Sequence, residues 1–372
     1  MRIGVPKEIK VHEYRVGMTP NSVREAAARG HEVVVQHGAA EHIGLDDAAY
    51  RTARARIAAT AAETYAAADL IVKVKEPQRE EVPMLRADQT LFTYLHLAAE
   101  PILARGLAAS GITAIAYETV TATNGSLPLL APMSEVAGRI SVQAGAHCLE
   151  MEQGGRGVLL GGAAGVPSAR VTVLGAGVAG INAIRMAIGL EARVTVLDID
   201  RMRLYAIDQQ FGAAIDTVFS THATIEEHVV NSDLVIGAVL VAGASAPKLI
   251  TREMVAAMPR GSVIVDISID QGGCAETSRP TTHAEPTYVV DGVVHYCVTN
   301  MPGAVARTST FALNNVTLPF ILALADKGPE RALLEDAHLR GGLNLYRGHV
   351  THAKVAEALG LPFMNAETAL NA

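Results

Sequence analysis

Three glycines in this sequence have the spacing that a bound diphosphate requires. Gly175, Gly177 and Gly180 form the pattern G-x-G-x-x-G within "VTVLGAGVAG", residues 171–180. Residues without a side chain let the backbone turn tightly and approach a pyrophosphate, and the following helix offers free N–H groups to the phosphate charge. A strand-like run precedes the motif and a helical pattern follows it, so it predicts a dinucleotide site. The alternative is a tight strand-to-helix turn that binds nothing.

An acidic residue stands where such a site needs one. The next strand-like run, "RVTVLD", ends at Asp198, 23 residues after Gly175. A carboxylate there accepts hydrogen bonds from the adenosine ribose hydroxyls, and its charge repels a 2′-phosphate. The residue therefore favours NAD over NADP. Arg203 could bind that phosphate, but beside Asp198 we interpret it as covering the adenine or the ribose.

Five polar residues stand at or just beyond the ends of other predicted strands: Arg15, Lys75, His96, Glu118 and Asp270. Ligands of open α/β sheets bind beyond the carboxyl ends of the strands. An arginine can hold a carboxylate through two parallel hydrogen bonds, a lysine adds positive charge, and an imidazole moves a proton near neutral pH. Any one of them could be a solvated surface residue, and Glu118 could be a structural acceptor. Together they indicate hydride transfer to or from a small acid.

Strand and helix patterns that could position these residues alternate along the chain. The first series of strands is "RIGVP", "EVVVQ", "DLIVKVK", "TLFTYLH" and "ITAIAYET"; a second begins at 171 with "VTVL", "RVTVLD", "DLVIGAV", "SVIVDIS" and "VVHYCVT". Alternation of this kind predicts parallel sheets covered by helices. We expect an α/β fold with two Rossmann-like doubly wound parallel-sheet domains.

Two long helical patterns flank the second series and are expected to join the domains. One begins near Ser134, a plausible N-cap with Glu135 in the first turn, and the other runs from about Pro302 to Lys327, with Pro319 as a possible kink. This arrangement predicts a cofactor domain inserted into a substrate domain. We expect the substrate domain at 1–130 and 306–372, and the NAD-binding Rossmann domain at 131–305.

Composition excludes several classes of partner. The net charge of −7 and the 4% aromatic content argue against a nucleic acid, and the charge also argues against an anionic membrane. No apolar run approaches the roughly 20 residues that span a bilayer, and no signal-peptide core opens the chain. The three cysteines fit no metal cluster, so we interpret them as reduced thiols of a cytoplasmic protein without a metal.

Ten stretches resemble one known family. They are "GVPKEIK", "EYRVGMTP", "VKVKEPQ", "FTYLHLA", "AYETV", "LLAPMSEVAGR", "GGRGVLLGG", "VIVDISIDQGGC", "RPTTH" and "VVHYCVTNMPGAVARTST". The chain is similar to the L-alanine dehydrogenase family from Met1 to about Pro362, in order and without a large gap. The resemblance implies reversible conversion of L-alanine, NAD and water into pyruvate, ammonium and NADH, by a cytoplasmic enzyme that is typically a homohexamer.

The resemblance also implies roles for individual residues. Arg15 and Lys75 would hold the substrate carboxylate and carbonyl, His96 would be the catalytic acid/base, and Asp270 would stabilise the cationic intermediate. The pocket lining falls on Tyr94, Met133 and Asn300. The cofactor positions fall on Ser134, Gly175, Gly177, Val178, Gly180, Asp198, Arg203, Ser220, Val239, Leu240, Ile267, Asp270, Val298 and Met301.

Three alternatives remain open from the sequence. The first is the NAD(H)-binding component of a proton-translocating transhydrogenase, which needs a membrane partner and no organic substrate. The second is a related amino-acid dehydrogenase or cyclodeaminase with a longer substrate, for which we find no extra acidic residue to meet a distal amine. The third is a homologue that has lost its activity.

Overall fold

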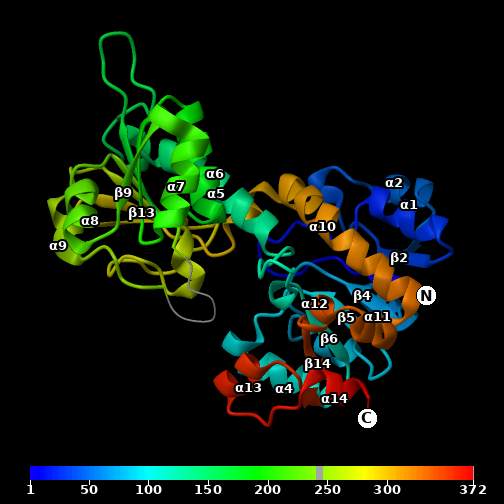
Figure 1. Cartoon of the computed structure of the whole chain (residues 1–372). Coiled ribbons are helices and arrows are strands. Elements are labelled where there is room, and N and C mark those ends of the chain that lie inside the picture. Colours follow the sequence, from blue (N-terminus) through cyan, green and yellow to red (C-terminus); the bar gives the residue numbers. More distant parts are fainter. Residues whose placement is uncertain (240–245, 372) are drawn as a thin grey trace. The chain divides into compact units, whose positions relative to one another are not determined.

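The structure is a computed structural model, and it describes residues 1–239 and 246–371. The chain divides into two compact units (Figure 1). Unit 1 comprises Met1–Met133 and Ala306–Ala372, and unit 2 comprises Ser134–Val305. The first division falls in the first turn of helix α5 (Ala131–Cys148), and the second falls at the start of α10 (Ala306–Lys327). The roles expected for the two units stay predictions.

The described part of unit 1 contains an eight-stranded sheet. Its strand order is β15-β14-β6-β5-β4-β1-β2-β3, and the strands from β3 to β6 are parallel. This is the 3-2-1-4-5-6 order of Rossmann-like folds, extended by antiparallel β14 and β15. The bounds are β1 Arg2–Val5, β2 Glu32–Gln36, β3 Arg56–Ala58, β4 Leu70–Val72, β5 Thr90–Thr93, β6 Thr113–Ala116, β14 Leu343–Tyr346 and β15 His349–Val350.

The helices of unit 1 are mostly short, and α1, α2, α3, α12 and α14 begin with a side-chain cap. Thr19 accepts a hydrogen bond from the Ser22 N–H at the start of α1, and Pro20 occupies its first position, where no N–H is needed. Apart from α10, the helices are α1 Pro20–Ala28, α2 Asp47–Thr52, α3 Ala61–Ala67, α4 Pro101–Ser110, α11 Pro329–Glu335, α12 Ala337–Arg340, α13 Ala353–Leu359 and α14 Ala366–Leu370.

The described part of unit 2 contains a seven-stranded sheet with the same core order. The order is β12-β13-β11-β10-β7-β8-β9, parallel except for β12. The expected fold class, two Rossmann-like parallel sheets, is confirmed. The strand bounds are β7 Arg170–Leu174, β8 Arg193–Asp198, β9 Ile215–Phe219, β10 Leu234–Gly237, β11 Val263–Asp266, β12 Thr287–Val290 and β13 Val293–Tyr296.

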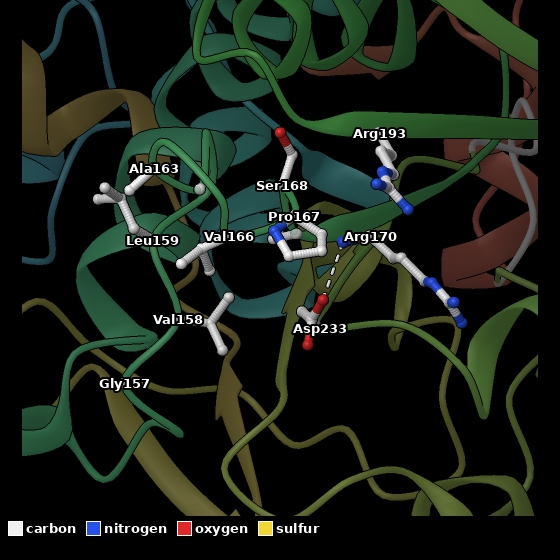
Figure 2. Close-up of a pocket in the computed structure, with 12 residues that line it drawn as sticks. Gly157, Val158, Leu159, Ala163, Val166, Pro167, Ser168, Arg170, Arg193 and Asp233 are labelled. Carbon is white, nitrogen blue, oxygen red and sulfur yellow. Dashed lines mark hydrogen bonds between the residues drawn. The ribbon is translucent and has the colours of Figure 1, made fainter.

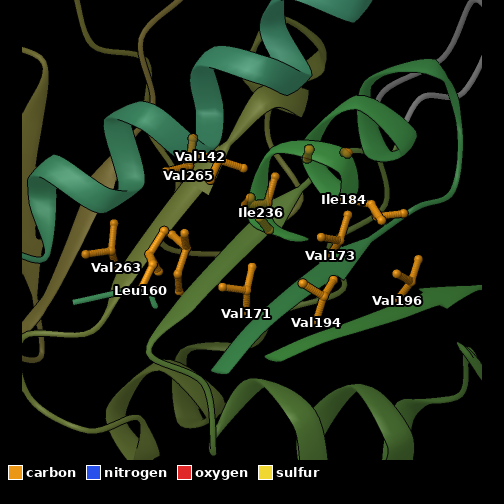
Figure 3. Packing of buried hydrophobic residues seen from close by; sticks show 14 of the residues in the cluster. Val142, Leu160, Val171, Val173, Ile184, Val194, Val196, Ile236, Val263 and Val265 are labelled. Carbon is orange, nitrogen blue, oxygen red and sulfur yellow. The ribbon is translucent and has the colours of Figure 1, made fainter. Parts of the chain in front are cut away.

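The unit 2 sheet is buried on both faces, which explains its nearly continuous apolar strands. Val171 and Val173 of β7 pack in one cluster with Ile184, while Leu174 packs in another with Val229. Figure 3 shows the first of these clusters, with alternate residues of neighbouring strands pointing to the same side. Besides α5, the helices of this unit are α6 Val178–Gly189, α7 Arg201–Phe211, α8 His222–Val229 and α9 Arg252–Ala257.

The two long helices differ in part from what the sequence predicts. The N-cap prediction for Ser134 is wrong, because α5 begins at Ala131 and Pro132 lies in its first turn, where the missing N–H costs nothing. Pro319 lies inside α10 without ending it. Within the described residues, one helical segment, Met301–Lys327, is long and apolar enough to cross a membrane by length and composition; half of its most apolar window is buried inside the protein.

Candidate active site

In unit 1, the predicted site residues lie at one edge of the sheet. Strands β1, β4, β5 and β6 are parallel neighbours, so their carboxyl ends meet at that edge. Arg15, Lys75, His96 and Glu118 follow these four strands in turn. The gap in strand order between β1 and β4 is the switch point at which open α/β sheets bind ligands.

Arg15 is almost completely buried and is held by Glu13. Its Nε donates to Glu13 Oε1 at 2.7 Å, and its Nη2 donates to Oε2 at 2.6 Å. Nη1 donates to the sulfur of Met133 at 3.1 Å. Burial opposes the charge of Arg15, but Glu13 outweighs that effect, so the pKa of Arg15 is raised. The side-on edge of the guanidinium is thus engaged by Glu13, which the sequence did not indicate.

Lys75 is partly buried, and its backbone is fixed from two directions. Its N–H donates to Glu8 Oε1 at 3.3 Å, and its carbonyl accepts from the Thr93 hydroxyl at 2.9 Å. Burial lowers the pKa of Lys75, and the positive charge of Arg15 lowers it further. Lys75 and Arg15 therefore form an electropositive pair at this edge, and an anion placed there would relieve their repulsion.

A buried ion network anchors Glu8. Lys73, fully buried, lies 3.1 Å from Glu8 and 2.8 Å from Glu81, and Tyr65 donates to Glu81 at 2.9 Å. Burial raises the pKa of Glu8, while Lys73 opposes that shift. Lys73 and not Lys75 is thus the structural lysine of "DLIVKVK".

His96 has an exposed side chain and an unusual backbone conformation. Its φ is +49° and its ψ is 37°, in the left-handed region. The ring stacks on Tyr94 with centroids 5.9 Å apart and an interplanar angle of 8°. Tyr94 is buried and donates its hydroxyl to the carbonyl of Leu129. The imidazole is therefore exposed at the carboxyl edge of the sheet and packs against a tyrosine ring that is itself held in place.

Glu118 is a structural acceptor for the backbone beside His96. Its carboxylate accepts from the His96 N–H at 2.6 Å and from the Leu95 N–H at 3.2 and 3.3 Å. It lies on the 3₁₀ turn Tyr117–Thr119 that follows β6. Of the two interpretations that the sequence left open for Glu118, this geometry supports the structural one.

In unit 2, the glycine turn has the geometry that a phosphate cradle needs. Gly175 has a φ of +101°, and a Cβ on Gly180 would lie 1.8 Å from the Gly175 carbonyl oxygen. Gly177 is the N-cap of α6 with no side-chain cap, and a Cβ there would meet nothing within 4 Å. The start of α6 thus has no side-chain cap and has room beside Gly177, which suits a dinucleotide diphosphate.

Asp198 connects the glycine turn to the end of β8. One carboxylate oxygen accepts from the Ala176 N–H at 2.7 Å, and the other accepts from the Asp200 N–H at 2.7 Å. Arg203 is 57% exposed and reaches Asp198 only at 3.9 Å, with Asp200 at 3.5 Å. The carboxylate is therefore positioned by the turn itself, and Arg203 is a loosely held cation beside it.

The remaining cofactor candidates in unit 2, apart from Ser134 in α5, follow the carboxyl ends of its strands. Leu240 lies outside the described residues. Ser220 follows β9 and donates its N–H to the Asp198 carbonyl at 3.0 Å, and Val239 follows β10 and accepts from the Ser268 hydroxyl at 2.7 Å. The others are Val178 at the start of α6, Ser134 in α5, Ile267 after β11, and Val298 and Met301 after β13.

Asp270 is exposed on the short 3₁₀ helix Ile267–Gln271, which a different aspartate holds in place. Asp266, fully buried, accepts from the N–H groups of Ser268 and Cys274 at 3.0 and 2.8 Å. Asp266 was not predicted from the sequence, although an acid that ends an apolar strand must find partners when it is buried.

Asn300 also occupies a left-handed position, with a φ of +60°. Its carbonyl accepts from the Gly303 N–H at 2.9 Å and contacts His283 Nε2 at 3.2 Å. The 3₁₀ turn Met301–Val305 starts immediately after it. Asn300 therefore marks a sharp bend after β13.

A cavity of about 450 Å³ lies elsewhere in unit 2. Figure 2 shows that Arg170 and Arg193 line it, together with Asp233, which accepts from the Arg170 N–H at 2.8 Å. Arg170 and Arg193 are the first residues of β7 and β8, so the cavity lies at the amino ends of the strands. It contains none of the predicted site residues.

Within the described ranges, no group of three or more His, Cys, Asp or Glu residues could hold a metal ion. All three cysteines are buried as free thiols. Burial raises the pKa of Cys148 and that of Cys297 to about 11 each, which disfavours the reactive thiolate.

Fold and site together define a class of protein: two Rossmann-like units, one with a dinucleotide turn and one with cationic and imidazole groups at a strand edge. Comparisons with known proteins place the chain within this class. The N-terminal domain of the alanine dehydrogenase/PNT family matches residues 4–137, and the C-terminal domain of that family matches residues 141–353. The chain therefore belongs to the alanine dehydrogenase/PNT family.

Individual relatives match over nearly their whole lengths. The alanine dehydrogenase of Halomonas elongata is 62% identical over 98% of this chain and 99% of its own length, and that of Mycolicibacterium smegmatis is 54% identical over the same shares. A solved L-alanine dehydrogenase has a TM-score of 0.94 and 49% identity, covering 97% of this chain and 99% of its own. A transhydrogenase from Sinorhizobium meliloti has a TM-score of 0.82 and 27% identity, covering 94% and 100%.

Proposed function

We propose that this protein is an NAD-dependent L-alanine dehydrogenase that converts L-alanine to pyruvate and ammonium reversibly. The observation that carries the proposal is the grouping of Arg15, Lys75 and His96 at the ligand-binding edge of unit 1. The glycine turn and Asp198 in unit 2 supply the dinucleotide site that hydride transfer requires. Full-length similarity to proteins named alanine dehydrogenase supports the same substrate.

In this proposal, unit 1 binds pyruvate through its two cations. Because Glu13 occupies the side-on edge of Arg15, the carboxylate of pyruvate meets the guanidinium end-on, at Nη1 and Nη2. The thioether of Met133 is a weak acceptor that an anion displaces from Nη1. Lys75 lies beside the carbonyl oxygen and polarises it.

The remaining groups handle protons and charge. In the direction of amination, ammonia attacks the carbonyl carbon, and His96 protonates the oxygen that leaves as water. Asp270 stabilises the positive charge of the resulting iminium through its own negative charge. NADH, when bound, supplies the hydride to Cα. In deamination the same groups act in reverse, and His96 removes a proton from the attacking water.

We further propose that NAD and not NADP is the cofactor, because the Asp198 carboxylate is where a 2′-phosphate would lie. The charge of −7 argues against a nucleic acid or an anionic membrane as a partner. The family resemblance supports a cytoplasmic homohexamer. The transhydrogenase component is a weaker candidate, because a hydride-donating module without an organic substrate has no use for Arg15, Lys75 and His96 at one edge.

The test is NADH oxidation by the purified protein, followed at 340 nm with a panel of 2-keto acids in the presence and absence of ammonium. We expect oxidation only when pyruvate and ammonium are both present, with less activity for longer keto acids. Oxidation that favours a keto acid with a distal amine would replace alanine as the substrate. Hydride transfer to a nicotinamide analogue without pyruvate would favour the transhydrogenase component.

A further inference from the structure

The backbone of His96 is held by a carboxylate from the neighbouring strand connection. Strands β5 and β6 are parallel and in register, with Thr93 opposite Ala116, so the turn Tyr117–Thr119 lies beside the end of β5. From this turn, Glu118 accepts the consecutive N–H groups of Leu95 and His96. Consecutive N–H groups that converge in this way form an anion-binding concavity, and hydrogen bonds to an ionised acceptor are stronger than neutral ones.

This contact bears directly on where the imidazole points. His96 has a φ of +49°, a conformation that residues other than glycine rarely adopt, so the surrounding structure must maintain it. Stacking on Tyr94 restrains the ring from one side, but a stacked ring can still slide with its backbone. The 2.6 Å bond from the His96 N–H to Glu118 fixes the backbone from which the ring projects.

The same arrangement recurs at Lys75. Glu8 Oε1 accepts the N–H groups of Val74 and Lys75 at 2.7 and 3.3 Å. In both cases a carboxylate receives the N–H of a site residue and of the residue before it, just beyond a strand end. Glu8 also pairs with buried Lys73, so its removal would disturb the core, whereas the structure records no ion pair for Glu118 within the described residues.

We propose that Glu118 is the positioning residue for His96: its carboxylate fixes the Leu95–His96 backbone so that the imidazole reaches the substrate carbonyl oxygen. This inference rests on the role proposed above for His96. Glu118 does not itself touch the substrate. Two other titratable groups among the described residues, Tyr94 and His352 at the start of α13, interact electrostatically with Glu118. The Nδ1 of His352 is buried with no hydrogen-bond partner.

The first test compares Glu118→Met, which keeps the volume and removes both acceptor oxygens, with Glu118→Gln, which keeps one. For Glu118→Met we expect kcat for pyruvate amination to fall about 10- to 100-fold, since a displacement of about 1 Å costs that much. KM for pyruvate and Kd for NADH should change less than about threefold. Glu118→Gln should recover most of kcat. The control is Asp69→Asn, because Asp69 also accepts a backbone N–H, from Arg2 at 2.9 Å, but lies at the amino end of β4.

A second test introduces Glu118→Met and Glu118→Gln into a protein that also carries His96→Ala. If Glu118 acts through His96, Glu118→Met should lower the residual kcat of His96→Ala by less than about twofold. Hydrogen–deuterium exchange of the peptide covering residues 94–98 should be faster in Glu118→Met than in the wild type and intermediate in Glu118→Gln. This exchange measurement does not depend on activity.

The outcomes separate the inference from the proposed function. The positioning role is wrong if the wild type aminates pyruvate and Glu118→Met has the same kcat as the wild type. It is also wrong if Glu118→Met and His96→Ala lower kcat multiplicatively when they are combined. If Glu118→Met does not fold, two other results overturn the positioning role equally. One is unchanged exchange of residues 94–98 in Glu118→Gln, and the other is unchanged kcat and exchange in Glu118→Asp, whose carboxylate is drawn back by one methylene. If the wild type shows no turnover of pyruvate with ammonium, the proposed function fails first.

Discussion

At the scale of single residues, the two cations of the candidate site, Arg15 and Lys75, differ in how far nearby carboxylates compensate their positive charge. Arg15 has its own carboxylate, Glu13, bonded at 2.6 and 2.7 Å. The acid next to Lys75 in sequence, Glu76, is instead bonded to Lys10 at 2.5 Å. Lys75 therefore supplies the less compensated positive charge of the site, and the affinity for an anionic substrate should follow the protonation of Lys75.

The pH dependence of pyruvate binding follows from this. Burial and Arg15 lower the pKa of Lys75 below its ordinary value of 10.5, so the lysine loses its proton at a lower pH than a solvated lysine does. Because the lost charge is the one that attracts pyruvate, the Kd of pyruvate for the NADH complex should begin to rise below pH 10.5. NADH fluorescence measures this Kd without ammonia. A pyruvate Kd that stays flat to pH 10.5, or an NADH Kd that rises in parallel, would contradict the role of Lys75.

The choice of nucleotide should depend on Asp198. Two unit charges about 4 Å apart repel by about 4 kcal/mol at an effective dielectric constant of 20, so the carboxylate should make NADPH poorer than NADH by orders of magnitude. Asp198→Asn keeps an acceptor for the Ala176 N–H and removes the charge. We expect kcat/KM for NADPH to rise at least about tenfold and that for NADH to fall.

The matched control for this substitution is Asp200→Asn. Asp200 caps α7 and lies beside the same arginine, Arg203, and an asparagine preserves the cap. Its effect on the ratio of NADPH to NADH activity should be several-fold smaller. Wild-type protein that already uses NADPH as well as NADH would show that Asp198 does not face the 2′ position.

At the scale of elements, the contact between β7, the glycine turn and α6 has no spare volume. A Cβ on Gly180 would lie 1.8 Å from the Gly175 carbonyl oxygen, and backbone atoms cannot move aside as a flexible side chain can. Overpacking typically costs about 1–3 kcal/mol, and here the strain falls on the phosphate-binding turn. Gly180→Ala should therefore weaken NADH binding by roughly 5- to 150-fold, measured by fluorescence titration.

The same helix provides the control. A Cβ on Gly189, the last residue of α6, would meet nothing within 4 Å. Gly189→Ala should leave the Kd of NADH unchanged and should not lower the melting temperature. If both substitutions weaken NADH binding equally, the effect belongs to the helix as a whole and not to the turn.

The sequence predicts the central elements well, because they are buried on both faces and read as apolar runs. All ten strands expected from such runs are present, but β3, β9, β12, β14 and β15 were not predicted. In β9 only Ile215 is buried, which leaves little apolar pattern. The antiparallel pairing of Leu343 with Ile115 joins segments more than 200 residues apart, so no local pattern encodes it.

The site was predictable to a similar extent and for a related reason. Strand ends can be located from apolar runs, so Lys75 and His96 could be assigned to the carboxyl edge of the sheet. The carboxylates that fix them, Glu8 and Glu118, act through backbone N–H groups in connections whose conformation the sequence does not reveal. A partial signal was available at Asp266, an acid at the end of an apolar strand.

At the scale of the whole molecule, the chain leaves unit 1 to form unit 2 and then returns to complete the first sheet. The returning segment is joined to unit 1 by specific bonds: the side-chain oxygen of Asn314 accepts from the Thr19 N–H at 2.7 Å and from the Ser22 hydroxyl at 2.9 Å. Strand β14 then pairs with β6, which precedes the turn of Glu118. Strand β14 therefore helps to hold the strand from which the turn of Glu118 follows.

The central claim is that this one chain moves a hydride to Cα of pyruvate and takes its nitrogen from ammonium. The most direct measurement is mass and NMR analysis of the product formed from pyruvate, ¹⁵N-ammonium and NADH deuterated at C4, with each C4 epimer tested in turn. We predict L-alanine that carries ¹⁵N and, from one epimer only, one deuteron at Cα. Lactate labelled at C2 without ¹⁵N, or deuterium recovered only in a second nicotinamide, would contradict the account.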